Sequence, residues 1–460
     1  MSETPEPTPG RRSAARSLSR RLGPIELVAI VVPLLTVAAL ALVRPVDDAT
    51  TVHPPTDVAL ERTTLVCPTA LAGAKTVSLA DADGASGDVT TRLPDEDTIA
   101  LDGTKRVGKS AAVAVQATED LASGLLGTRY GDGVATSCRA PQPDQWFTGV
   151  GAAPEHSSTL EVTNPDGGPA VADVTVLGPD GPVDVPALRG VTVPGGRTLR
   201  FDLAEVVPTR DELALQVHVS RGRLGVDVVD QVDELGRGAR SEDWLPSQAE
   251  AGTAAYLLGL GGKPGDRTLV LANPGDSEAR VQVKVVTKES EFALADAEEV
   301  RVSPGSTEAV DLTDLLEGRA GRGVIGLRLD ATLPVTATLR TLAGGDLSHA
   351  VAGAPLASRT ALALPGGPSR LLIAGADNAG VATYVVTDAQ GDQVADERVE
   401  LTPGEAARIK LPSKGAVLDL TIQRTGAVAS VEVGPPGLAV LPLSELVVDG
   451  RVPDVRPALR

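Results

Sequence analysis

A strand–turn–strand pattern occurs three times along the chain at intervals of about 100 residues, and this repetition restricts the fold more than any other feature. In each copy, apolar residues alternate along the chain on both sides of a dipeptide that ends in glycine. The dipeptides are Gly195-Gly196, Pro304-Gly305 and Pro403-Gly404. Alternation with period two around a turn is typical of β-strands, and glycine tolerates the positive φ that such a turn requires. The chain is therefore predicted to repeat one β-unit.

A second marker supports the same interval, because Asn164-Pro165 and Asn273-Pro274 lie 109 residues apart and each follows an alternating stretch. Each interval holds about seven short strand candidates, the number found in an immunoglobulin-like β-sandwich. Solenoid and propeller repeats are shorter, at about 20–50 residues. The predicted fold class is all-β, with tandem immunoglobulin-like β-sandwich repeats at 146–245, 254–356 and 359–443. We expect separate units in a row rather than one closed assembly.

Composition agrees with this fold class and argues against one class of partner. Hydrophobic residues make up 42% of the chain, but only eight residues are aromatic, so the cores must be aliphatic. The formal net charge is −19. A chain this acidic repels phosphate backbones, so no nucleic-acid partner is expected.

The amino-terminal region has the composition of a membrane-targeting segment. Residues 1–23 contain five arginines and are predicted to be a basic cytoplasmic tail, and residues 24–43 are mostly apolar and are predicted to be a transmembrane anchor or signal segment. The basic flank indicates an amino end inside the cell. Cleavage is the alternative to a retained anchor, since Ala39-Leu40-Ala41 has the small-x-small form of a cleavage site. A buried core helix is a third interpretation. Residues 44–62, with three prolines, are predicted to be a stalk.

The two cysteines of the chain, Cys67 and Cys138, lie near the two ends of a predicted β-domain at 63–142. In an oxidising compartment a single pair of cysteines usually forms a disulfide, and two buried free thiols are the alternative. This domain lacks the repeated turn, so it is either a diverged repeat or a different small fold. Residues 444–460 are predicted to be a C-terminal tail.

No linear motif indicates catalysis, a cofactor or a metal. The run from Gly259 to Lys263 resembles a phosphate-binding loop, but Pro264 follows where Ser or Thr should begin a helix. Calcium is an alternative for the loop with Asp81 and Asp83, whose spacing differs from an EF-hand. The four histidines have no metal-ligand spacing; they are His53, His156, His218 and His349.

Trp146 and Trp244 are the candidate ligand contacts, because aromatic ring faces are the usual platforms for sugars. Their position near the ends of the first repeat also fits packing within the core or between domains. Both interpretations remain open at the level of sequence.

Cys67, the Ser137-Cys138 segment that leads to Trp146, and the repeated turns resemble an uncharacterised family of actinobacterial envelope proteins, known as a domain of unknown function. The resemblance implies a membrane-anchored, β-rich protein whose folded part lies outside the cell. It implies no activity and no catalytic residues.

These observations predict a non-catalytic extracellular scaffold or interaction protein of the bacterial cell envelope, tethered by a single N-terminal helix. Its expected partners are the membrane, through the anchor, and a cell-wall polymer or another envelope protein. If the segment is cleaved, the protein is secreted. The alternatives are a recognition module for cell-wall glycan or a small ligand, and a hydrolase without a linear signature.

Overall fold

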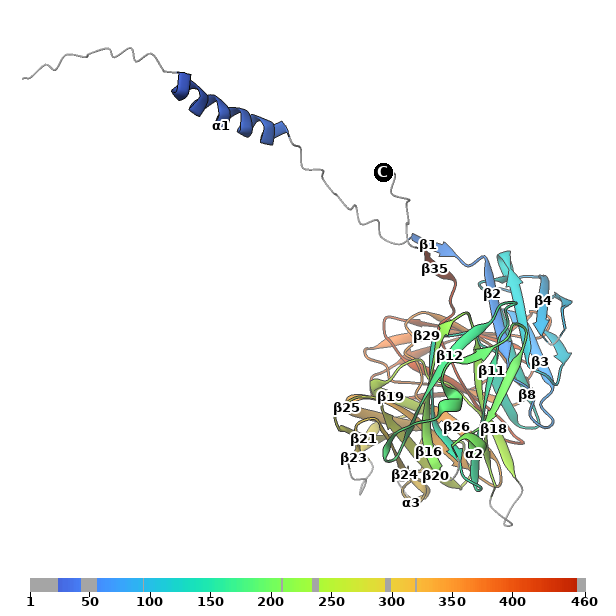
Figure 1. Ribbon diagram of the computed structural model, residues 1–460. Coiled ribbons are helices and arrows are strands. Elements are labelled where there is room, and N and C mark those ends of the chain that lie inside the picture. The colour runs from blue at the N-terminus through green and yellow to red at the C-terminus, as the bar shows by residue number, and fades with distance from the viewer. Residues whose placement is uncertain are drawn as a thin grey trace, which may run out of the picture. The chain divides into compact units, whose positions relative to one another are not determined.

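The computed structural model describes residues 24–42, 56–93, 95–207, 210–233, 240–293, 299–318 and 321–452 (Figure 1). The chain divides into two compact units, one of residues 1–56 with 452–460 and one of residues 57–451. The predicted cytoplasmic tail, most of the predicted stalk and the end of the predicted C-terminal tail lie outside the described residues.

Helix α1 (Pro24–Leu42) occupies the predicted anchor segment. Within the described ranges, however, no helix is both long and apolar enough to cross a membrane.

The first sandwich contains the two cysteines and has two four-stranded sheets. Their orders are β2-β7-β4-β5 and β6-β3-β8-β9. The strands are β2 (Arg62–Cys67), β3 (Thr76–Asp81), β4 (Gly87–Leu93), β5 (Asp97–Leu101), β6 (Lys105–Gly108), β7 (Val113–Thr118), β8 (Leu125–Gly131) and β9 (Val134–Ser137). Aliphatic side chains from both sheets and the two cysteines form its core.

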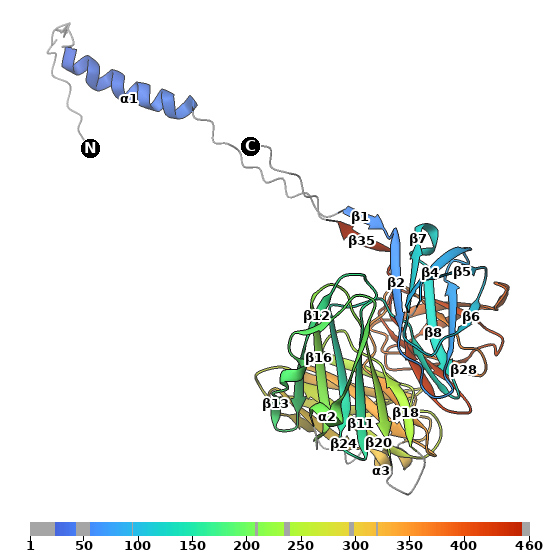
Figure 2. The same cartoon turned by 45° about the vertical axis from the view of Figure 1, so that its right-hand side comes forward.

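The second sandwich has the orders β13-β12-β16-β10 and β15-β11-β17-β18, with β14 also paired to β12. A short pairing of β10 with β11, at Ala152 and Ser157, joins the two orders into one continuous sheet. Figure 2 labels β11, β12, β13, β16, β18 and α2 of this sandwich. Its elements are β10 (Asp144–Ala152), β11 (His156–Thr163), β12 (Ala170–Gly178), β13 (Gly181–Val183), β14 (Val191–Val193), β15 (Thr198–Asp202), α2 (Leu203–Val206), β16 (Arg210–Arg221), β17 (Gly225–Val232) and β18 (Ser241–Leu245).

The third sandwich uses one long strand in both of its sheets. The first part of β25 pairs with β19 and β21, and its second part pairs with β20 and β26. Its elements are β19 (Gly252–Leu258), β20 (Asp266–Asn273), β21 (Ala279–Val286), β22 (Glu291–Ala293), β23 (Val300–Val302), β24 (Ser306–Asp311), α3 (Thr313–Glu317), β25 (Gly326–Leu342) and β26 (Leu347–Val351).

The fourth sandwich has the orders β27-β32-β29-β30 and β31-β28-β33-β34. Its strands are β27 (Arg359–Ala363), β28 (Ser369–Ala374), β29 (Gly380–Thr387), β30 (Gln393–Leu401), β31 (Ala407–Lys410), β32 (Val417–Gln423), β33 (Val428–Val433) and β34 (Ala439–Pro442).

All four sandwiches share one topology. When the strands of each are counted in chain order, one sheet reads first-sixth-third-fourth and the other fifth-second-seventh-eighth. In this count, β13 and β14 together are the fourth strand of the second sandwich, and β22 and β23 together are the fourth strand of the third. The long strand β25 serves as both the sixth and the seventh strand of the third sandwich. An immunoglobulin constant domain places its first strand beside its second, whereas here the first pairs with the sixth, and only in the second sandwich does it also pair with the second, at Ala152 and Ser157. The all-β class is thus confirmed, and the immunoglobulin-like form is not.

The repeated turn has the predicted backbone but connects strands differently from the prediction. Gly196, Gly305 and Gly404 have φ values of +65°, +61° and +78°. The turns lie between the fourth and fifth strands, which belong to different sheets. Each turn therefore carries the chain from one sheet to the other instead of closing a hairpin, because the flanking strands bond to other neighbours.

The second marker has a structural role that is the same in both copies. The buried Asn164 amide donates to the carbonyl oxygens of Gly168 and Val193, at 2.8 and 2.9 Å. Asn273 donates in the same way to Ser277 and Val302, at 2.8 and 3.0 Å. The side chain thus ties the end of the second strand to the end of the fourth and satisfies buried backbone groups.

The sandwiches form a closed cycle of contacts rather than separate units. Their eighth strands contact one another in turn, β9 with β18, β18 with β26, β26 with β34, and β34 with β9. A separate apolar cluster lies at each of the four contacts. The prediction of separate units was wrong because it assumed that each sandwich buries only its own interior. Strand β1 (Thr56–Ala59) pairs with β35 (Asp449–Val452), which brings the two ends of this unit together (Figures 1 and 2).

Candidate functional site

A buried cluster of charged and polar side chains lies where the second and third sandwiches meet, and Asp230 is at its centre. One oxygen of Asp230 accepts hydrogen bonds from His156 Nε2 at 2.9 Å and Ser158 Oγ at 2.5 Å. The other oxygen accepts from His349 Nε2 at 2.9 Å. The side chains of Asp230 and His349 are 0% exposed and that of His156 is 4% exposed. One carboxylate thus joins histidines from two sandwiches.

Strand register explains how these residues meet. Ser158 on β11 lies directly opposite Asp230 on β17, and His349 on β26 lies opposite Arg340 on β25. Arg340 reaches back across the contact and forms an ion pair with Glu212 at 2.6 Å. It also lies 3.0 Å from His156 Nδ1. The same Arg340 nitrogen lies 3.2 Å from Nε2 of this ring, so His156 lies between Asp230 and the guanidinium.

The two buried aspartates of the cluster have pKa values that are shifted in opposite directions. Burial alone would raise the pKa of Asp230, but the charge and hydrogen bonds of His156 and His349 outweigh it and hold that pKa well below its usual range. Burial raises the pKa of Asp243 well above its usual range, and Asp346 and Asp230 add to this effect. Asp243 Oδ2 lies 4.0 Å from His349 Nδ1. The pKa values of the two carboxyl groups are thus shifted in opposite directions.

The geometry of the cluster favours a structural role, in which it holds the two sandwiches together, over a catalytic one. A Ser-His-Asp hydrolase needs serine on one imidazole nitrogen and aspartate on the other. Here the Ser158 hydroxyl and both imidazoles converge on the same carboxylate. Burial also denies a substrate access. Within the described ranges, no group of three or more His, Cys, Asp or Glu side chains could hold a metal ion.

The tryptophans predicted as candidate ligand contacts are both buried, Trp146 at 5% and Trp244 at 3% exposure. Trp146 packs with Ala272 of the third sandwich, and Trp244 packs with Leu71 of the first. Their rings therefore lie in contacts between sandwiches and present no free face to a sugar. The ligand-contact assignment is corrected, and the packing alternative describes both residues.

The predicted disulfide between Cys67 and Cys138 is present, with an S–S distance of 2.06 Å.

Of the remaining histidines, His218 forms an exposed pair with Asp144, and His53 lies outside the described residues. In the loop considered for calcium, one Asp81 oxygen accepts backbone N–H groups.

A second charged cluster lies near the contact between the first and second sandwiches. Asp227 on β17 is directly opposite Glu161 on β11, so two carboxylates face each other across the strands. Glu161 is buried and accepts from the Thr69 backbone N–H at 2.7 Å. Burial, with the charge of Glu161, raises the pKa of Asp227 to about 7, although Arg139 and Arg129 oppose the rise.

Replacing Asp227 with asparagine is expected to remove a pH dependence of stability. Because the pKa of Asp227 is raised by folding, its contribution is fully present below about pH 4 and is lost as the pH rises to about 7. Its half-buried position moderates the loss, which we expect to be roughly 2–4 kcal/mol. Urea denaturation at pH 5 and pH 8 gives the change in the free energy of unfolding between these two pH values. The change in the wild type minus the change in Asp227→Asn measures the loss. The exposed Asp180→Asn variant should leave the wild-type pH dependence intact. An equal pH dependence in Asp227→Asn and wild type would contradict the assignment.

The residues of the His156–Asp230–His349 cluster were not recognised as a site from the sequence. Their positions extend over almost 200 residues, and no motif links them. The one available signal was polar residues inside apolar strands, such as Asp230 between Val228-Val229 and Val232. Such positions face either a sheet neighbour or another domain, and the sequence does not say which.

A comparison with curated proteins found no match. The sequence model of a family of unknown function (DUF5719) matches residues 89–412, which include both charged clusters and parts of all four sandwiches. The match covers more than half of the chain and agrees with the predicted resemblance to a domain of unknown function. The chain therefore belongs to the DUF5719 family.

Proposed function

We propose that this protein is a non-catalytic scaffold or interaction protein of the bacterial cell envelope. The observation that carries the proposal is the position of the His156–Asp230–His349 cluster. These residues have the chemistry of a catalytic site, but they are buried between two sandwiches and bond to one carboxylate. Their arrangement favours a structural function and gives the hydrolase alternative no support.

The proposed location is outside the cytoplasm, and the disulfide supports it. Disulfides persist in oxidising compartments and are rare in the cytosol of most bacteria. The formal charge of −19 suits a domain that stays soluble and avoids association. The proposed partner is another envelope protein, with no nucleic acid and no cofactor involved.

The sheet edges are the proposed binding surfaces. In every sandwich the fourth and fifth strands lie at the edges of their sheets. The longest of these is β30, with nine residues, and most of its side chains are exposed. An extended segment of a partner can add to such an edge through backbone hydrogen bonds. Charged side chains along β30, such as Asp396 and Arg398, would restrict pairing to a complementary partner.

Two experiments in intact cells test this proposal. A cysteine introduced at the exposed Asp392 should react with a membrane-impermeant maleimide before lysis, and reaction only after lysis would reject the location. A photo-crosslinking amino acid at Arg398 of β30 should give a discrete adduct with an envelope protein. The same group at Asp180, on the loop between β12 and β13, is the control. Failure of the β30 position to give any adduct beyond that control would reject the edge as the binding surface.

A further inference from the structure

The third sandwich has a pocket whose charge is opposite to that of the chain as a whole. Its volume is about 290 Å³, and it lies between the loop that joins β19 to β20 and described residues at and after the end of α3, among them Gly318, Gly321 and Arg322. Among the described residues, its charged lining consists of three cations and one anion, which are Lys263, Arg267, Arg322 and Glu317. The chain carries a formal net charge of −19, so this excess of cations is not expected from composition.

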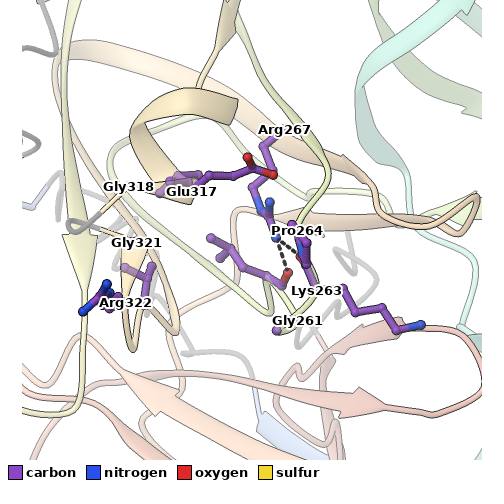
Figure 3. A pocket seen from close by; sticks show the side chains of 12 residues that line it. Gly261, Lys263, Pro264, Arg267, Glu317, Gly318, Gly321 and Arg322 are labelled. Carbon is purple, nitrogen blue, oxygen red and sulfur yellow. Dashed lines mark hydrogen bonds between the residues drawn. The ribbon is translucent and has the colours of Figure 1, made fainter.

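Arg267 is a fixed, buried cation in the pocket wall. It is 6% exposed, and its guanidinium donates to the carbonyl oxygens of Lys263 at 2.7 Å and Gly265 at 2.8 Å. Its Nε is buried and, among the residues that the structure describes, has no hydrogen-bond partner. Figure 3 shows the guanidinium directed at the loop with Glu317 close by. The pocket wall therefore contains a buried positive charge that backbone carbonyl oxygens hold in place.

The other two cations form no direct ion pair, although the charge of Lys263 acts on Asp346, where it partly opposes the rise in pKa that burial causes. Lys263 and Arg322 are exposed, and neither forms an ion pair with a described acidic residue. Figure 3 shows them on opposite sides of the pocket, with the Lys263 ammonium directed outward. Rotation about its side-chain bonds can turn Lys263 toward a ligand. Glu317 is already engaged, because it accepts the Gly265 backbone N–H at 3.0 Å.

We propose that this pocket binds a small oxyanion, a carboxylate or phosphate group. Arginine and lysine are the side chains that recognise such groups, and glycines in the lining let a ligand approach the backbone closely. The loop is not a nucleotide-binding loop, because Pro264 follows Lys263 and no long helix begins there. Binding at this site does not depend on the proposed scaffold function, and the two can fail separately.

Calorimetric titration of the full chain with inorganic phosphate, and in parallel with acetate, tests the proposal. At least one anion should show saturable binding to a single site. Lys263→Gln combined with Arg322→Gln should weaken it about tenfold or more, since two charge-assisted contacts are lost. Glu317→Gln keeps the acceptor for Gly265, removes the competing charge, and should strengthen binding about threefold.

The matched control is Lys288→Gln combined with Arg301→Gln. Both are exposed residues of the same sandwich outside the pocket, and the pair removes the same charge. Equal weakening by the control and pocket pairs would mean non-specific attraction and would overturn the site. Absence of saturable binding of both anions up to about 10 mM, a free energy near −3 kcal/mol, would overturn it as well. Binding of phosphate alone or acetate alone would identify which oxyanion the pocket takes.

Discussion

Replacing Asp230 with alanine is expected to lower the free energy of unfolding by about 3–5 kcal/mol. The substitution leaves His156, Ser158 and His349 without their common acceptor in a site that water does not reach. Buried donors that lose a partner retain the full cost of desolvation. Tryptophan fluorescence during urea denaturation measures the loss, because Trp146 and Trp244 are buried at contacts between sandwiches.

The chain provides a matched control on its surface. Asp144 and His218 form a pair at 2.7 Å whose side chains are 49% and 56% exposed. Because exposed pairs contribute little, Asp144→Ala should cost at most about 0.5 kcal/mol. The two variants remove the same kind of contact and differ in burial. Similar small costs for both would show that the Asp230 cluster does not hold the second and third sandwiches together.

The local features of the fold were predictable because neighbouring residues encode them. Period-two alternation predicted the strands, and glycine in the repeated dipeptides predicted the positive φ at Gly196, Gly305 and Gly404. The single cysteine pair predicted the disulfide. The pairing order was not predictable, because it depends on which distant strand lies alongside, and alternation is the same for any partner.

The closed cycle could have been inferred from strands that are apolar on both faces. In β28, Leu371 and Ile373 lie in the core of the fourth sandwich, and Leu372 between them packs against the third. In β17, Val228 faces its own core and Val229 faces the first sandwich. A strand that is buried on both faces reads as a continuous apolar run. Interpreted as parts of alternating strands, these runs predict burial on one face of the strand only.

The candidate site depended on register, which the sequence does not specify. His156 and Asp230 meet because β11 and β17 pair with His156 opposite Val232 and Ser158 opposite Asp230. A shift of one residue would turn these side chains to the other face of the sheet. His349 reaches the same carboxylate only because two sandwiches pack together. The site therefore requires both the β11–β17 register and the packing of the second sandwich against the third, and neither can be read from the linear sequence.

Replacing both Cys67 and Cys138 with serine is expected to lower the free energy of unfolding of the first sandwich by about 4 kcal/mol, because the bond closes a loop with a sequence separation of 71 residues. Both side chains lie in the core, so the serine hydroxyls add a cost of burial. Urea denaturation with and without reductant measures the effect through the fluorescence of Trp244, which packs against this sandwich.

Reductant separates the cross-link from the substitution. Wild type should become less stable when reductant is added, whereas the double serine variant should not change, because it has no bond to break. The remaining difference between reduced wild type and variant is the cost of the hydroxyl groups alone. Backbone hydrogen bonds between Val66 and Arg139, at 2.8 and 3.0 Å, hold the same two segments together without the sulfurs. If reductant left the wild-type midpoint unchanged, these bonds and the contacts with the neighbouring sandwiches would be sufficient, and the disulfide would not stabilise the first sandwich.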